Sequence, residues 1–285
     1  MTFHHAILPD GRLHVQHGPI DLIIGAKGAR DAAYGAALAA FDGVLEGLVA
    51  VLDRLKRDGW YGVRPPLGLN SPVAERMVEA VACHRGFVTP MAAVAGSVAD
   101  HVLAAMTEVP GLHRAYVNNG GDIALYLVRG EVFRLAIAGL DGTGLGAVEI
   151  GARDGIGGVA TSGQGGRSLS FGIAESVTVL AKDAAAADVA ATLIANAVDL
   201  PGHSAIKRVA AEALQDDSDL GERRVVAHVG ALDREEVTRA LARGAKLAED
   251  MQRQGLIGAA ALFLRGQTRI VGQIARTEQR KVEHV

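Results

Sequence analysis

The sequence contains one cysteine, Cys83, and few aromatic residues, which make up 4% of its 285 positions. A lone cysteine excludes an internal disulfide and a four-cysteine zinc site, and it suits a reducing compartment. The net charge is −3 and no cluster of five basic residues occurs, so nucleic acid is not an expected partner. No uninterrupted apolar run approaches the ~18 residues of a membrane span, and the N-terminal residues do not resemble a signal peptide. We therefore expect a cytoplasmic protein with no membrane partner.

Small residues dominate instead. Alanine and glycine, with 50 and 36 residues, occupy about 30% of the chain, so packing must depend on close backbone approach rather than on bulky side chains. The length fits one large domain or two halves. We expect a single domain over residues 1–273, built from two strand-plus-helix halves of about 1–110 and 111–273, and a polar tail over 274–285.

Hydrophobic periodicity predicts both helices and strands. The helices are expected at 31–56, 71–84, 90–107, 183–198 and 233–253. The main strands are expected at 13–17, 20–24, 114–117, 123–128, 132–138, 148–151, 176–181, 224–229, 259–264 and 268–271, with those at 114–138 forming an antiparallel meander. Residues 216–223 are charged and polar, which is typical of a surface loop. Together these segments predict an α+β fold with long helices packed on one face of an antiparallel sheet.

Two glycine-containing turns could carry chemistry. Asn118, Asn119, Gly120, Gly121 and Asp122 link two apolar segments; the glycines permit close backbone approach to a ligand, and Asn118 and Asp122 offer directed hydrogen bonds. The same residues are also those of an ordinary hairpin turn. Further along, Thr161, Ser162 and Gly163 could present amides and hydroxyls to an anion, or form a plain loop.

The third motif lies on the predicted helix 183–198. Asp188, Thr192 and Asn196 are four residues apart and therefore share one face of an otherwise apolar helix. A carboxylate and a hydroxyl so placed suit Mg²⁺, which prefers oxygen ligands and bridges proteins to phosphates. The alternative is an ordinary solvated face, although no Lys or Glu occurs between residues 184 and 198.

Motifs of other enzyme classes are missing from the sequence. It contains neither a P-loop nor a Gly-x-Ser-x-Gly elbow, and the glycines at 142–146 follow no strand–helix crossover of the dinucleotide-binding type.

In this order the motifs resemble those of the ApbE family of Mg²⁺-dependent flavin transferases, over roughly residues 90–198, and the pattern is closest to a short, uncharacterised branch of that family. The matching segments are Asn118–Gly121, Thr161–Gly163, Thr178–Ala181 and Ala187–Thr192. The resemblance implies a T-fold-like α+β core and an enzyme that binds FAD with Mg²⁺ on its pyrophosphate. It also implies transfer of the FMN moiety to a threonine of an acceptor protein, with AMP leaving.

The resemblance also assigns site residues. Asp188 and Thr192 would be metal ligands, with the carbonyl of Ala92 as a third. The nucleotide would be bound by Asn118, Gly120, Gly121, Asp122, Thr161, Ser162 and Gly163, and by Gly96 and Asp100 in the segment that corresponds to the family's Ala-Lys-Gly-x-x-x-Asp. No catalytic residue is assigned. T-fold proteins often assemble, so a homo-oligomer is also expected.

The sequence departs from the family pattern at three places. Val94 and Ala95 stand where the family has its lysine, Gln164 replaces an acidic residue, and no His-x-x-Asp-Pro follows. Two alternatives therefore stay open beside flavin transfer: an enzyme that uses the same groove for a pterin, purine or other small planar substrate, and a binding protein that kept the pocket without the reaction.

Overall fold

The computed structural model describes residues 3–64, 68–138, 144–166 and 168–273, so the predicted tail at 274–285 lies outside the described residues. Its centre is a nine-stranded sheet in which every neighbouring pair is antiparallel. In spatial order the strands are β1 (His4–Ile7), β2 (Leu13–His17), β3 (Ile20–Gly28), β4 (Leu112–Asn119), β5 (Asp122–Leu127), β8 (Gly158–Ser162), β9 (Ser176–Ala181), β12 (Ala259–Leu264) and β13 (Gln267–Val271).

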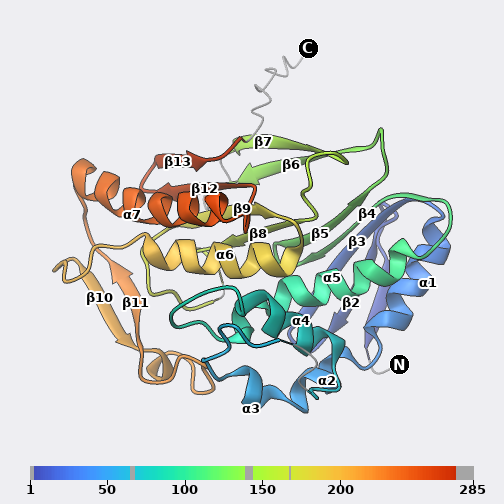
Figure 1. Ribbon diagram of the computed structural model, residues 1–285, viewed down its shortest axis with the longest axis horizontal. Helices are drawn as coiled ribbons and strands as arrows, with labels where there is room; N and C mark the ends of the chain where they lie inside the picture. Colours follow the sequence, from blue (N-terminus) through green and yellow to red (C-terminus); the bar gives the residue numbers. More distant parts are fainter. Residues whose placement is uncertain (1–2, 65–67, 139–143, 167, 274–285) are drawn as a thin grey trace.

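The long helices cover one face of this sheet, which confirms the predicted fold class (Figure 1). The helices are α1 (Arg30–Phe41), α2 (Val44–Val49), α3 (Leu52–Leu55), α4 (Pro72–Val81), α5 (Val94–Thr107), α6 (Ala184–Ala197) and α7 (Arg234–Arg253), and the short 3₁₀ helices are η1 (Pro90–Ala93) and η2 (Ala211–Ala213). One buried cluster joins β2–β5 to α1, α4 and α5, and a second joins β8, β9 and β12 to α6 and α7.

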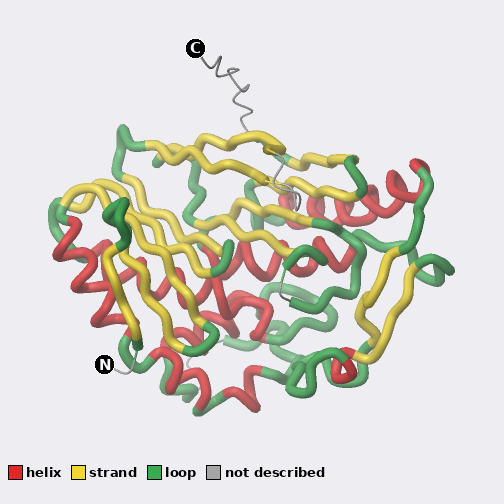
Figure 2. Tube along the Cα trace, turned by 180° about the vertical axis from the view of Figure 1, so that it is seen from behind, coloured by secondary structure: helices red, strands yellow, loops and turns green. Residues whose placement is uncertain are grey.

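The opposite face of the sheet is partly covered by a two-stranded ribbon of β6 (Val132–Ala138) and β7 (Gly144–Gly151). Phe133, Val148 and Ile150 from the ribbon pack on Leu125 and Leu180 of the sheet. From behind, the strands lie in front of the helices (Figure 2). The predicted meander over 114–138 is therefore wrong in its last strand, because β5 pairs with β8 instead of with β6. A second ribbon, β10 (Ile206–Ala210) with β11 (Arg224–Val229), stands at one end of the molecule.

The predicted helix over 31–56 is broken into α1, α2 and α3. Asp42 is extended (φ −62°, ψ 127°) and Gly43 has a left-handed backbone (φ 78°), so the chain turns after Phe41. The apolar spacing nevertheless continues across the break, because Phe41, Val44, Leu48 and Leu55 are all buried in one cluster. Residues 30–49 have the length and apolar composition of a membrane span, the one such stretch found among the described residues, and this break divides them.

Replacing Gly43 with alanine should lower the free energy of unfolding by about 1 kcal/mol, because a Cβ disfavours the left-handed conformation. No atom lies within 4 Å of the added Cβ, so the loss reports backbone conformation alone. Urea denaturation measures this change in the free energy of unfolding. Gly43→Asn is the matched control: asparagine tolerates this conformation and should recover part of the loss, and equal stability of all three proteins would contradict the explanation.

Candidate functional site

A cavity of about 290 Å³ lies beside α6, at the N-terminal end of η1 and α5. Its lining comes from η1 and the residues before it, the first turn of α5, the start of β5, one face of α6, and two loops at 168–171 and 215–220. The lining residues are Phe87, Val88, Thr89, Met91, Ala92, Val94, Ala95, Asp122, Ser168, Leu169, Phe171, Asp188, Thr192, Leu193, Asn196, Gln215, Ser218, Asp219 and Leu220. Every charged side chain among these described residues is an aspartate.

The polar line predicted on α6 faces this cavity. Asp188, Thr192 and Asn196 all line it and are partly exposed, whereas the flanking positions Val189 and Ala191 are fully buried. Asp183 caps the helix by accepting a hydrogen bond from the amide of Ala186 at 2.7 Å, which fixes where the helix begins and hence where the line points. The polar side chains are thus held at a cavity wall.

Asp188 is the most perturbed group of the site. Burial raises its pKa well above the ordinary value, and the negative charge of Asp122 raises it further. The backbone amide of Gly96, which donates to Asp188 Oδ2 at 3.0 Å, acts in the opposite direction. A carboxylate held among other carboxylates is electrostatically unfavourable unless a proton or a cation joins it.

Gly96 and Asp100 occupy the contact between α5 and α6 and do not contribute to the cavity lining. Asp100 is 8% exposed, and its two oxygens accept hydrogen bonds from the amides of Ala184 and Ala185 at 3.0 and 2.9 Å. Burial raises the pKa of Asp100 to about 6, while these amide bonds lower it. The two helices therefore cap each other: α5 supplies Asp100 to the start of α6, and α6 supplies Asp188 to the start of α5.

The Asn-x-Gly-Gly turn forms the β4–β5 hairpin. Asn118 Oδ1 accepts a hydrogen bond from the amide of Gly121 at 2.8 Å, and both Gly120 (φ 66°) and Gly121 (φ 116°) have positive φ. Asn119 Nδ2 donates to the carbonyl of Ala95 at 3.2 Å, which fastens the turn to the start of α5. Of the turn residues, Asp122 belongs to the cavity lining.

The Thr-Ser-Gly segment ends β8, next to this turn. The amide of Thr161 donates to Asp122 Oδ1 at 3.4 Å, and the Thr161 hydroxyl lies 2.9 Å from the Thr178 hydroxyl on β9. Gly163 (φ 141°) passes so close to β9 that a Cβ would lie 2.6 Å from the carbonyl oxygen of Glu175. Ser162 is partly exposed beside it. The structure thus brings the two sequence motifs together, and joins them to the cavity through Asp122.

The loop at 215–220 is the part of the site that sequence reasoning missed. It was predicted as plain surface, yet Ser218, Asp219 and Leu220 line the cavity, and Asp219 Oδ2 accepts a short hydrogen bond from the Thr89 hydroxyl. Next to it the Arg223 guanidinium stacks over the Phe87 ring at 3.5 Å. The run of aspartates at 216–219 was the available signal, but nothing local indicates which helix such a run contacts.

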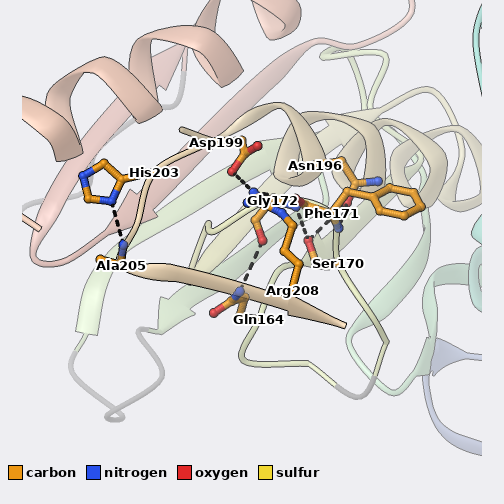
Figure 3. Close-up of polar contacts among 9 residues, drawn as sticks. All are labelled: Gln164, Ser170, Phe171, Gly172, Asn196, Asp199, His203, Ala205 and Arg208. Atoms are coloured by element: carbon orange, nitrogen blue, oxygen red, sulfur yellow. Dashed lines mark hydrogen bonds and ion pairs between the residues drawn. The ribbon is translucent and has the colours of Figure 1, made fainter. Parts of the chain in front are cut away.

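Asn196, the third residue of the polar line, positions the loop at 168–171 (Figure 3). Its Oδ1 accepts hydrogen bonds from the Ser170 hydroxyl at 3.1 Å and from the Phe171 amide at 2.9 Å. Arg208 of β10 pairs with Asp199 and donates to the Phe171 carbonyl at 3.5 Å. The loop that carries Phe171 into the cavity is therefore held by side-chain contacts from two elements.

A family model described as "AbpE bacteria" matches residues 5–270. The chain belongs to this family. The UPF0280 protein of Methanothrix thermoacetophila is 42% identical over 135 residues, which cover 47% of the chain and 55% of the relative. The UPF0280 protein of Methanothermobacter thermautotrophicus is 33% identical over 162 residues, or 55% of the chain and 62% of the relative. These matches span about half of the curated relatives' length, and the predicted membership of an ApbE-like, uncharacterised branch is confirmed.

Solved structures give a weaker likeness over almost the whole chain. The ApbE protein of Thermotoga maritima has 13% identity and a TM-score of 0.47, covering 97% of both chains. The flavinyl transferase ApbE of Pseudomonas stutzeri has 14% identity and a TM-score of 0.45, covering 94% of this chain and 93% of that one.

The donor set of the cavity fits a hard divalent cation. Asp122, Asp188 and Thr192 offer carboxylate and hydroxyl oxygens, which Mg²⁺ prefers, and Ala92 belongs to the same lining. No group of three or more His, Cys, Asp or Glu side chains suited to a metal occurs among the described residues, so an ion here would keep waters or take ligand oxygens. Burial and then repulsion from Asp122 raise the pKa of Asp188, and the positive charge of a bound cation would offset both effects.

Proposed function

We propose that this AbpE-family protein binds FAD or a related nucleotide in the cavity beside α6, together with Mg²⁺, and transfers the FMN moiety to an acceptor protein. The observation that carries the proposal is that Asp188 and Thr192 of α6 line one cavity together with Asp122, whose charge acts on Asp188. Family membership and the ordered motifs support it. Asp188 and Thr192, with the carbonyl of Ala92, would hold the cation, which would neutralise charge on the pyrophosphate.

The remaining parts of the site would position the nucleotide. Asp122 lines the cavity and accepts a hydrogen bond from Thr161, so both glycine-containing motifs would lie next to the bound nucleotide. Phe87 and Phe171, whose rings are 6.0 Å apart, line the same cavity and offer apolar contact to a planar ring. In the transfer, the acceptor hydroxyl oxygen bonds to the FMN phosphorus, the pyrophosphate bond breaks, AMP leaves and the hydroxyl proton is released.

Thermal melting tests the binding step. FAD at 100 times its dissociation constant should stabilise the protein by about 2.7 kcal/mol, which corresponds to a rise in Tm of roughly 5–10 °C for a chain of this size. The rise should need millimolar Mg²⁺ and disappear with EDTA. An unchanged Tm with FAD and Mg²⁺ would contradict the proposal. Release of AMP during incubation with FAD and an acceptor protein then tests the transfer.

The second candidate is an enzyme or non-catalytic binder of a small planar ligand such as a pterin or purine. Two observations favour it: the cavity measures about 290 Å³, at the lower end of ligand sites, and its described lining offers no basic side chain to a phosphate. A rise in Tm with a pterin but not with FAD would select this candidate. Binding of FAD without AMP release would instead indicate a binding protein.

Cytoplasmic location, a homo-oligomer and the absence of a membrane partner are further proposals. Size-exclusion chromatography with light scattering measures the oligomeric state directly.

A further inference from the structure

A second cavity, of about 180 Å³, lies in the other half of the molecule and shares no lining residue with the one beside α6. It is formed by the β1–β2 turn, β3, the start of α1, β4 and Phe133 of the β6–β7 ribbon. Four cationic side chains line it: Arg12, Lys27, Arg30 and Arg114. Nothing in the family motifs accounts for such a cluster in a chain with a net charge of −3.

The positive charge of this basic cavity is only partly compensated. Asp10 pairs with Arg12 at 2.6 Å, and Glu131 is shared between Lys27, at 2.6 Å, and Arg114, at 3.8 Å. Arg30 forms an ion pair with its neighbour Asp31, at 3.7 Å, whose carboxylate is 97% exposed. Four cations face Asp10, Glu131 and the solvent-exposed Asp31, so an excess of positive charge remains at the cavity.

Aromatic side chains form the apolar wall of the basic cavity. Tyr116 lies across Gly25, where a Cβ would come within 2.3 Å of its ring, so the absence of a side chain at Gly25 makes room for it. Phe133 meets Tyr116 edge to face with the ring centroids 6.0 Å apart. The Tyr34 hydroxyl is occupied, because it donates to the carbonyl of Gly11 at 3.0 Å. The cavity thus combines cationic side chains with an aromatic, apolar side.

The positive charge and the aromatic side of the basic cavity together indicate the class of ligand that it would bind. Guanidinium groups bind phosphate oxygens in a planar, bidentate geometry. A phosphate monoester carries about −1.5 to −2 charges at pH 7, which are opposite in sign to the excess positive charge at the cavity. The amides at the start of α1, which has no side-chain cap, add positive potential on the same side. At about 180 Å³ the cavity is smaller than the one beside α6, which favours a phosphoryl group with a small organic body.

The geometry points to a second ligand site in which Arg12, Arg30, Lys27 and Arg114 bind the phosphoryl group of a small phosphate monoester, with Tyr116 and Phe133 against its organic part. This site is independent of the function proposed for the cavity beside α6.

Isothermal titration of the full-length protein with phenyl phosphate, and separately with inorganic phosphate, tests the site. We expect saturable 1:1 binding of phenyl phosphate, at least tenfold tighter than inorganic phosphate. The double variant Arg12→Ala/Arg30→Ala should weaken it at least tenfold. Arg30→Gln alone, which removes an exposed ion pair with Asp31, should weaken it several-fold and keeps the test valid if the double variant fails to fold.

The matched control is Arg134→Ala/Arg269→Ala, which removes the same charge from exposed positions outside the basic cavity and should change the affinity less than twofold. Asp188→Asn should also leave phenyl phosphate binding unchanged, and this separates the site from the one proposed for FAD. The inference is overturned if phenyl phosphate does not bind, if inorganic phosphate binds equally well, or if the control double variant or Asp188→Asn loses as much affinity as the cavity variant.

Discussion

Asp188→Asn is expected to raise the Tm of the ligand-free protein at pH 7 and, at the same time, to abolish its stabilisation by FAD and Mg²⁺. The first effect follows from the pKa of Asp188, which burial and Asp122 hold well above the unfolded value near 3.8. Between those two pKa values the folded protein binds more protons than the unfolded chain, so its free energy of unfolding falls as the pH rises. An amide avoids that loss and can still accept the hydrogen bond from Gly96.

The second effect follows from the proposed metal site. Without the carboxylate, the gain of about 2.7 kcal/mol expected for wild type at saturating FAD should vanish. The ligand-free variant should melt above wild type at pH 7, because an amide does not carry the cost of ionising a buried side chain at position 188. This difference should narrow towards pH 4, because less of that cost remains at lower pH. Differential scanning fluorimetry over pH 4–8 measures both effects.

Asp31→Asn is the control, because it removes the same charge from a carboxylate that is 97% exposed and distant from both glycine turns in the sequence. It should leave the response to FAD and Mg²⁺ unchanged and should not raise the ligand-free Tm, because a carboxylate in the first turn of α1 favours the folded state. An Asp188→Asn protein that melts below wild type at pH 7 would contradict the raised pKa of Asp188, and one that keeps the full response to FAD and Mg²⁺ would show that Asp188 does not hold a cation.

The polar face of α6 could be predicted from the sequence because every part of the argument is local. Asp183 marks the start of the helix, and the four-residue spacing of Asp188, Thr192 and Asn196 fixes their common side. Strands β9, β11 and β12 were likewise predicted with the bounds that the structure shows. Each lies between clear turn residues, so the apolar run defines both of its ends.

What the sequence could not show depends on contacts between distant segments. The alternation of 132–138 indicates a strand, but not that its partner is β7 instead of β5. In the same way, Asp219 reaches Thr89 across 130 residues, which no local pattern encodes.

Gly96 and Asp100 show that the same sequence motif can serve either ligand binding or helix packing. Both were assigned to the nucleotide on the family pattern, and both lie where α5 meets α6. A glycine and an aspartate four residues apart fit a ligand-binding turn and a helix-capping contact equally well when only the sequence is known. The structure gives a role to each residue. Gly96 lets α5 and α6 touch, and Asp100 caps the start of α6.

Gly96→Ala should lower the free energy of unfolding by about 3 kcal/mol or more and the Tm by roughly 10 °C. A Cβ at this position would lie 2.3 Å from the carbonyl oxygen of Ala184 and 2.7 Å from the amide nitrogen of Ala185. These are backbone atoms at the start of α6, so the helices must separate. Separation weakens the buried bonds from the amides of Ala184 and Ala185 to Asp100 and the bond from Gly96 to Asp188.

Gly35→Ala is the matched control for this prediction, since Gly35 lies in the exposed side of α1 and a Cβ there meets no atom within 4 Å. Alanine is the better helix former, so this variant should gain about 0.5–1 kcal/mol. The higher helix propensity of alanine also favours Gly96→Ala. A loss of stability in that variant must therefore come from the contact between α5 and α6. Chemical denaturation of the two variants should give changes of opposite sign. A neutral or stabilised Gly96→Ala protein would mean that α5 and α6 can separate without loss, and the reciprocal capping would then not hold the cavity wall.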